Sequence, residues 1–171
     1  MEEYAGVKFG AVVEEGEVGD VFGFLKLDMM IGEYISPKGN EGNMSLRVEN
    51  GFLIKKTGMR MTSLAEKDVV LVKKIEGGKV YVVGGTLSSE SVMHYMIYQK
   101  RKNAKIILHF HDDELLGKLD WESVGPFPYG SKELAEAVVD ASENRIKLEG
   151  HGFVIIADDK EELVKILGEI Y

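Results

Sequence analysis

The 171-residue chain contains no cysteine. It therefore has no disulfide framework and no thiolate metal site, a composition that is typical of proteins in a reducing compartment. No apolar run approaches the roughly 20 residues that a membrane-spanning helix requires, so we expect no membrane partner. The first four residues, Met1 to Tyr4, include two acids and no base. We therefore expect no signal peptide and a cytoplasmic location.

Basic residues are also in short supply, with 21 Lys and Arg against 29 Asp and Glu and a formal net charge of −8. A nucleic-acid binder needs a basic surface that displaces counterions, so this charge argues against DNA or RNA as a partner. Apolar residues make up 44% of the chain and charged residues 29%, as in ordinary globular proteins. We expect one domain over residues 1–171, with residues 1–19 as an N-terminal arm or edge strand of unknown role.

The hydrophobic pattern predicts hairpins and helices in one mixed α/β layered fold. Alternating segments flank Asn50-Gly51 and Gly77-Gly78, which are strong hairpin turn signals. Strands are expected over 45–48, 52–55, 69–75, 79–83, 106–111, 145–149 and 153–157. Helices are expected over 20–34, 88–102, 131–141 and from 158 to the end, and residues 112–130 are expected as a loop or a short irregular piece.

Three of the four histidines form a candidate metal site. His109 and His111 end an apolar run, and the side-chain period of a strand places both on one face. His151 lies between two glycines, beside another expected strand. Each part alone is weak, because an H-x-H pair is more often two hydrogen-bonded histidines and Gly-His-Gly can be a simple turn. Together they suit a divalent metal that keeps an open position for a substrate.

Glu90 is the candidate carboxylate beside this metal. By itself it is explained as a favourable charge in the first turn of a helix. The same segment also offers the hydroxyls of Ser88 and Ser89, and free backbone N–H groups at a helix start form an anion site. Residues 42–45 and 56–58 are two further loops with small residues and polar donors. Three such loops and a metal set predict a phosphate pocket.

The order of these motifs resembles the class II aldolase/adducin family. The resemblance rests on Gly42-Asn43-Met44-Ser45, Thr57-Gly58, Ser88-Ser89-Glu90, His109-Phe110-His111 and Gly150-His151-Gly152, and it spans roughly residues 20–165. It implies a three-layer αβα sandwich with a mixed, mostly antiparallel central sheet. It also implies a homotetramer with active sites at subunit boundaries.

The resemblance further implies a role for each motif residue. His109, His111 and His151 would bind zinc, although such ligands also accept other divalent transition metals. Glu90 would be the acid/base carboxylate, close enough to the metal to ligate it. Five residues would hold the substrate phosphate: Asn43, Thr57, Gly58, Ser88 and Ser89. The implied reaction is retro-aldol cleavage of a small sugar phosphate, through a zinc-stabilised enediolate, to dihydroxyacetone phosphate and an aldehyde.

Two alternatives to aldol cleavage remain open. The same site could serve a pentulose-phosphate 4-epimerase or a sugar-phosphate dehydratase, because these reactions differ only in which proton or bond moves. A non-catalytic interaction module like the adducin head is the other alternative, although it predicts decay of the metal residues. His94, one helical turn after Glu90, is expected to have a structural role rather than to be a fourth ligand.

The segment between His111 and Gly130 departs from the family pattern by being short. It begins with Asp112-Asp113-Glu114, either a solvated loop start or a set of acids that selects the substrate by charge. The tyrosine that the family's aldolases take from a neighbouring subunit as proton donor lies in this reduced region. Tyr129 matches a different motif, so the sequence gives it no role.

Overall fold

A single sheet of nine strands forms the centre of the computed structural model, which describes residues 10–88 and 90–171. The strands are β1 (Gly10–Glu14), β2 (Asn43–Val48), β3 (Gly51–Lys55), β4 (Val69–Glu76), β5 (Lys79–Val83), β6 (Ile106–Phe110), β7 (Glu122–Val124), β8 (Arg145–Leu148) and β9 (Gly152–Ala157). Their order is β1-β5-β4-β3-β2-β6-β9-β8-β7. Only β1–β5 and β7–β8 are parallel pairs within this described sheet. The predicted mixed, mostly antiparallel sheet is therefore confirmed.

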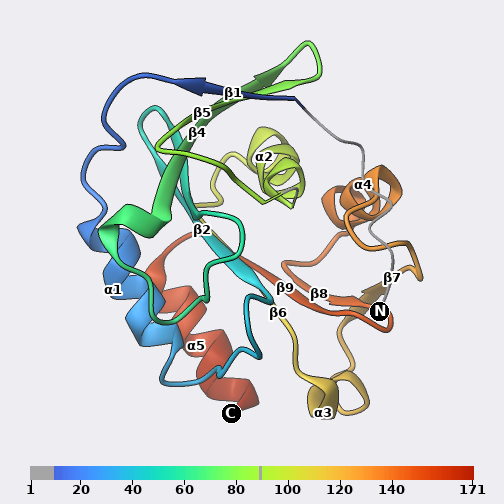
Figure 1. The fold of residues 1–171 in the computed structure, drawn as a ribbon. Helices are drawn as coiled ribbons and strands as arrows, with labels where there is room; N and C mark the ends of the chain where they lie inside the picture. Colours follow the sequence, from blue (N-terminus) through green and yellow to red (C-terminus); the bar gives the residue numbers. More distant parts are fainter. Residues whose placement is uncertain (1–9, 89) are drawn as a thin grey trace.

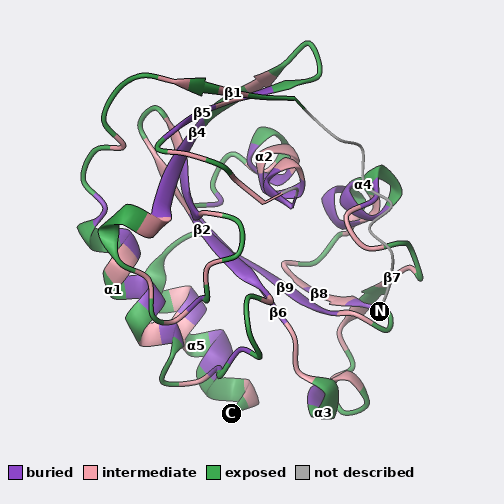
Figure 2. Ribbon diagram, viewed as in Figure 1, coloured by how far each residue is buried: buried purple, intermediate pink, exposed green. Residues whose placement is uncertain are grey.

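Helices cover both faces of this sheet (Figure 1). They are α1 (Phe22–Ile31), α2 (Ser91–Lys100), the short α3 (Asp113–Leu116), α4 (Lys132–Asp140) and α5 (Lys160–Ile170), with a 3-10 turn at Glu66–Asp68. One apolar cluster packs α1 and α5 against the sheet, and a second packs α2 and α4 against the opposite face. Burial is greatest in the central strands β6 and β9 (Figure 2). The three-layer αβα architecture is therefore confirmed.

Turn chemistry explains both predicted hairpins. The β2–β3 turn places Gly51 at φ 142°, and a Cβ there would lie 1.9 Å from the carbonyl oxygen of Val72, so only glycine fits. Gly77 and Gly78 join β4 to β5 with φ values of 58° and 73°. Both pairs are antiparallel, as predicted.

The main differences from the expected elements are short or lie at element ends. Residues 112–130 contain α3 and β7, of four and three residues, which are too short for a periodic pattern to reveal. The side chain of Asp112 caps α3 by accepting from the N–H groups of Glu114 and Leu115. The last helix is capped by Asp159 rather than Asp158, and α2 begins at Ser91 rather than at residue 88 or 89. Residues 1–9 and Ser89 lie outside the described residues, and no described helix is long and apolar enough to cross a bilayer.

A buried carboxylate ties α1 to the loop before β4. Asp28 is 1% exposed and accepts from the N–H groups of Thr62, at 2.7 Å, and Leu64, at 3.0 Å. Its removal would leave two backbone donors without their partner, beside a threonine held at φ 75°. We expect Asp28→Ala to lower the free energy of unfolding by about 2–3 kcal/mol, measured as a shift of the urea midpoint.

The matched control is Asp20→Ala, which removes an exposed acid that accepts from the N–H of Phe22. Its expected cost is about 1 kcal/mol or less. Equal midpoints for the two variants would show that Asp28 does not stabilise the loop.

Candidate metal centre

The end of β6 and the β8–β9 hairpin bring three histidines together. His109 pairs with Asn43 of β2 and Val154 of β9, and His111 follows two residues later on the same side of the chain. His151 lies in the turn that joins β8 to β9. One ring nitrogen from each histidine lies within 4.8 Å of those of the other two. The structure thus places the three rings together: the period of a strand predicted the pair His109 and His111, and the motif order added His151.

Glycines make this convergence possible. A Cβ at Gly152 would lie 2.5 Å from the carbonyl oxygen of Phe110 and 3.3 Å from Cδ2 of His111. A Cβ at Gly42 would lie 2.8 Å from the carbonyl oxygen of His109. The glycines of the G-N and G-H-G motifs therefore let neighbouring backbone approach the histidine strand closely.

Hydrogen bonds fix which nitrogens of the histidines face inward. The Nδ1 of His109 lies 3.0 Å from the carbonyl oxygen of Phe153, which can only accept, so Nδ1 carries the proton and Nε2 keeps a lone pair. That Nε2 faces Glu90 Oε1 at 3.4 Å and His111 Nε2 at 3.1 Å. The outer Nδ1 of His111 lies 3.6 Å from a Glu41 oxygen, and carboxylates commonly hold the outer nitrogen of metal-bound imidazoles. Because His109 Nε2 keeps its lone pair, the 3.1 Å hydrogen bond between the rings is donated by His111 Nε2–H, and a bound metal would take the place of that proton.

The protonation of the rings also fits a metal. Burial, with the neighbouring His111, lowers the pKa of His109 to about 3. Burial, with the other two rings, lowers the pKa of His151 to about 4. Both are therefore neutral near pH 7, the form that binds metals. The Nε2 of His151 is buried, has no hydrogen-bond partner among residues 10–88 and 90–171, and lies 4.0 Å from Glu90 Oε1. Two neutral imidazoles, the third ring beside them and an inward nitrogen without a hydrogen bond fit a divalent transition metal.

Glu90 stands at the N-terminus of α2, where its side chain is 6% exposed. Burial raises the pKa of its carboxyl, and the opposing influences include His151 and hydrogen bonds from Asn43 and Tyr129. The Nδ2 of Asn43 donates to Glu90 Oε2, while Oε1 faces the histidines. A carboxylate in a dry site, held by donors, is suited to taking and giving a proton.

A buried hydrogen-bond chain orients Glu90 from behind. His94 contacts Asn43 Oδ1 through Nε2 and the Ser45 hydroxyl, at 2.6 Å, through Nδ1. The Ser45 hydroxyl lies 2.8 Å from that of Tyr98. Burial lowers the pKa of His94 to about 3, so the ring is neutral and carries one proton. Because the Asn43 amide donates to Glu90, its oxygen accepts from His94 Nε2–H and Ser45 donates to Nδ1. His94 therefore has the structural role that its position predicts, and it is not one of the three converging rings.

Two of the predicted phosphate loops lie against each other. Lys56 forms an isolated antiparallel bridge with Leu87, and the N–H of Thr57 donates to the carbonyl of Thr86 at 3.4 Å. The Ser88 hydroxyl accepts from the N–H of Glu90 at 3.3 Å. The loops are therefore joined next to Glu90.

The predicted phosphate residues differ in how available they are. Thr57 and Gly58 are exposed and Ser88 is half-buried. The side chain of Asn43 is engaged at both ends by Glu90 and His94, so its amide orients the carboxylate. Ser89 lies outside the described residues.

Lys55 is a contributor to the site that the sequence reasoning missed. It is 4% exposed and donates to the carbonyl oxygens of Asn40 and Met59, each at 2.7 Å. It therefore holds the loop before β2 against the loop after β3, with its charge near Glu90. Burial lowers its pKa, and Glu90 and Asp28 oppose this shift. The sequence did offer one sign of its burial, because Lys55 directly follows the apolar run of residues 52–54.

Tyr129 is the second missed residue. Its hydroxyl hydrogen-bonds to Glu90, and its ring centroid lies 4.8 Å from that of His151. A tight turn places it there, with the Ser131 N–H donating to the Pro128 carbonyl at 3.1 Å and Gly130 at φ 68°. Nothing in the local sequence indicates the direction of this side chain, because it follows from tertiary packing.

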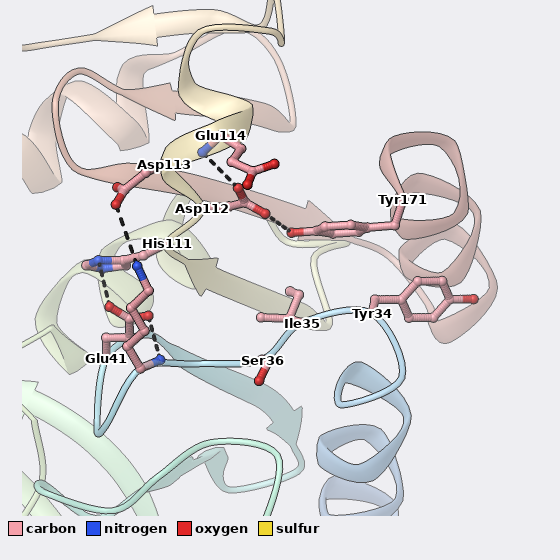
Figure 3. Close-up of a pocket in the computed structure, with 10 residues that line it drawn as sticks. Tyr34, Ile35, Ser36, Glu41, His111, Asp112, Asp113, Glu114 and Tyr171 are labelled. Atoms are coloured by element: carbon pink, nitrogen blue, oxygen red, sulfur yellow. Dashed lines mark hydrogen bonds and ion pairs between the residues drawn. The ribbon is translucent and has the colours of Figure 1, made fainter.

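A polar cavity of about 440 Å³ opens beside His111 (Figure 3). Its lining includes the three acids that follow His111. Asp112 caps α3 and accepts from the Tyr171 hydroxyl at 2.8 Å, so it is structural rather than solvated. Asp113 and Glu114, with side chains 83% and 87% exposed, are solvated as predicted.

The protein is thus an αβα protein with a candidate metal centre, in which three imidazoles converge beside a buried carboxylate. The model of the Class II Aldolase and Adducin N-terminal domain matches residues 30–117. The chain is 32% identical over 157 residues to an L-fuculose phosphate aldolase of Methanococcus maripaludis strain C5, covering 81% of this chain and 84% of that protein. The chain belongs to the class II aldolase/adducin family.

Solved structures agree on the fold. The L-fuculose-1-phosphate aldolase of Thermus thermophilus superposes with a TM-score of 0.65 at 22% identity, covering 86% of this chain and 85% of that one. A sugar-phosphate aldolase from Thermotoga maritima gives a TM-score of 0.69 at 21% identity, covering 86% and 89%. The αβα architecture is therefore shared with these proteins.

Proposed function

We propose that this protein is an aldolase-type lyase that cleaves a small sugar phosphate by a metal-dependent retro-aldol reaction. The observation that carries the proposal is the buried carboxylate of Glu90, held 3.4 Å from His109 Nε2 at the point where three histidines converge. Family membership and relatives named L-fuculose phosphate aldolase support cleavage over a purely structural role. We also propose assembly as a homotetramer, on the family resemblance.

His109, His111 and His151 would hold the metal, and zinc is the preferred candidate because neutral imidazoles suit it. When bound, a divalent cation supplies Lewis-acid stabilisation of the negative charge that develops on the ketone side of the breaking bond. The protein contributes the orientation of the ligands. The Nδ1–H of His109 is fixed on Phe153.

Glu90 is the group that moves the carbon-bound proton. As the carbon–carbon bond breaks, its electron pair stays with the ketone fragment, which becomes an enediolate. Protonated Glu90 then gives a proton to the carbon that has lost its partner, and dihydroxyacetone phosphate results. The Asn43 amide holds the carboxylate in place, so the proton is delivered from a fixed direction.

The phosphate would be held where two loops meet the start of α2. Thr57, Gly58, Ser88 and Ser89 offer hydroxyl and backbone N–H donors, and a helix N-terminus favours an anion. Lys55 adds a positive charge behind the loops. A fixed phosphate holds the reacting carbons at a constant distance from Glu90.

The test is product analysis. Protein reconstituted with zinc is incubated with L-fuculose 1-phosphate and other ketose 1-phosphates, and the products are followed by NMR. We expect dihydroxyacetone phosphate and the aldehyde to appear in equal amounts, and to disappear when the metal is chelated. An epimerised or dehydrated product in place of the two fragments, or no turnover by metal-loaded protein, would overturn the proposal.

A further inference from the structure

One aromatic side chain at the site has no part in the functions proposed above. Tyr129 lies over the metal centre, with its hydroxyl on Glu90 and its ring 4.8 Å from that of His151, the two planes inclined by 49°. Its side chain is half-buried. Tyr129 therefore contacts both the acid/base group and a candidate metal ligand.

The turn that carries Tyr129 leads directly into the N-terminus of α4. Ser131 donates its N–H to Pro128, and its hydroxyl accepts from the N–H of Leu134 at 3.1 Å as the cap of α4. The hydroxyl of Tyr129 is therefore positioned by regular structure rather than by a long loop. Among the other described tyrosines, Tyr34 and Tyr171 line the cavity beside His111.

We propose that Tyr129 is a catalytic residue that relays a proton between the substrate hydroxyl that becomes the aldehyde and the carboxylate of Glu90. This inference rests on the proposed function, because it assigns a role within the same cleavage. It differs from the expectation drawn from the family resemblance, in which a neighbouring subunit supplies the tyrosine. Here the chain that holds the metal also supplies the donor.

The relay accounts for every proton of the cleavage. One proton must leave the hydroxyl whose oxygen becomes the aldehyde carbonyl, and one must reach the carbon that keeps the bonding electrons. Tyr129 accepts the first proton as it passes its own to Glu90. Glu90, now protonated, gives that proton to the carbon. The tyrosine ends protonated and the carboxylate ends ionised, as they began, so no net proton is consumed and no oxidant or reductant is needed.

Two reactions of the same enzyme separate the roles of Tyr129 and Glu90. Exchange of the carbon-bound hydrogen of dihydroxyacetone phosphate with deuterium oxide needs Glu90 alone. Cleavage also needs transfer of the hydroxyl proton. In Tyr129→Phe, which keeps the ring against His151, we expect the kcat of cleavage to fall by about 100-fold or more while exchange changes by less than about threefold.

The control variants are Tyr81→Phe, on strand β5, and Tyr171→Phe, which tests the cavity tyrosine as a rival donor. Both are expected to retain cleavage and exchange, and bound metal is measured in every variant. Three results would overturn the relay: undiminished cleavage in Tyr129→Phe, equal losses of exchange and cleavage, or loss of metal from this variant. If wild-type protein performs neither reaction, the proposed function itself fails, which is a separate outcome.

Discussion

Glu90→Gln is expected to reduce both carbon–carbon cleavage and hydrogen exchange by about 1,000-fold or more, since a positioned acid/base group is worth 10²–10⁴-fold. The substitution keeps the shape of the side chain. Its amide oxygen can still accept from the Asn43 amide. Only the ability to take a proton is lost. The expected pattern is therefore a folded, metal-containing protein without proton transfer.

The measurements are steady-state kcat, deuterium incorporation into dihydroxyacetone phosphate, metal content and thermal midpoint. Glu114→Gln is the matched control, because Glu114 is 87% exposed and belongs to the cavity rather than to the metal centre. It is expected to retain wild-type rates. If Glu90→Gln kept a tenth of the wild-type exchange rate, another group would be the base.

The buried chain behind Glu90 explains why this carboxylate can remain both buried and ionisable. A protonated His94 would place a second positive charge near the metal and weaken cation binding. Burial instead keeps His94 neutral, with a pKa of about 3, and its single proton serves Asn43. The chain therefore fixes the direction of Glu90 without adding charge to the site.

Local sequence patterns predicted the framework because each depends on nearby residues. Asn50-Gly51 fixes a hairpin through the backbone that glycine allows, and the period of a strand places His109 and His111 on one face. The order of the motifs, through the family resemblance, predicted that His151 joins these two histidines. These features follow from turn geometry and strand register, which few tertiary contacts can override.

Side-chain contacts between distant loops could not be predicted from local sequence patterns. Asn43 was predicted to bind phosphate, yet in the structure its amide is held between Glu90 and His94, which lie 47 and 51 positions away. Lys55 bonds to carbonyls of two loops, and Tyr129 reaches Glu90 across the sheet end. The direction of such side chains depends on where whole elements pack, and periodicity carries no information about it.

Removing one of the three histidines should abolish metal binding at physiological concentrations. His151 is the best choice because it lies in a hairpin turn, 13% exposed, where truncation leaves the strands intact. In His151→Ala we expect metal affinity to fall by more than about 100-fold, beyond the 10–100-fold that typically follows loss of an outer hydrogen-bond partner. Cleavage should fall with it. Competition with a fluorescent zinc chelator gives the affinity, and elemental analysis gives the metal content.

Glu41→Gln provides the graded comparison, because Glu41 lies 3.6 Å from the outer nitrogen of His111 and has no direct place in the metal set. Glu41→Gln should weaken metal binding within the 10–100-fold range of outer partners.

Zinc should restore activity to chelator-treated wild type but not to His151→Ala, since a missing ligand cannot be replaced by more metal at ordinary concentrations. Wild-type affinity in His151→Ala would mean that the third ring only packs against Tyr129, and that two histidines and Glu90 form the site. The two variants together therefore distinguish a metal ligand from an outer partner, because the two kinds of loss differ in the expected size of the fall in affinity.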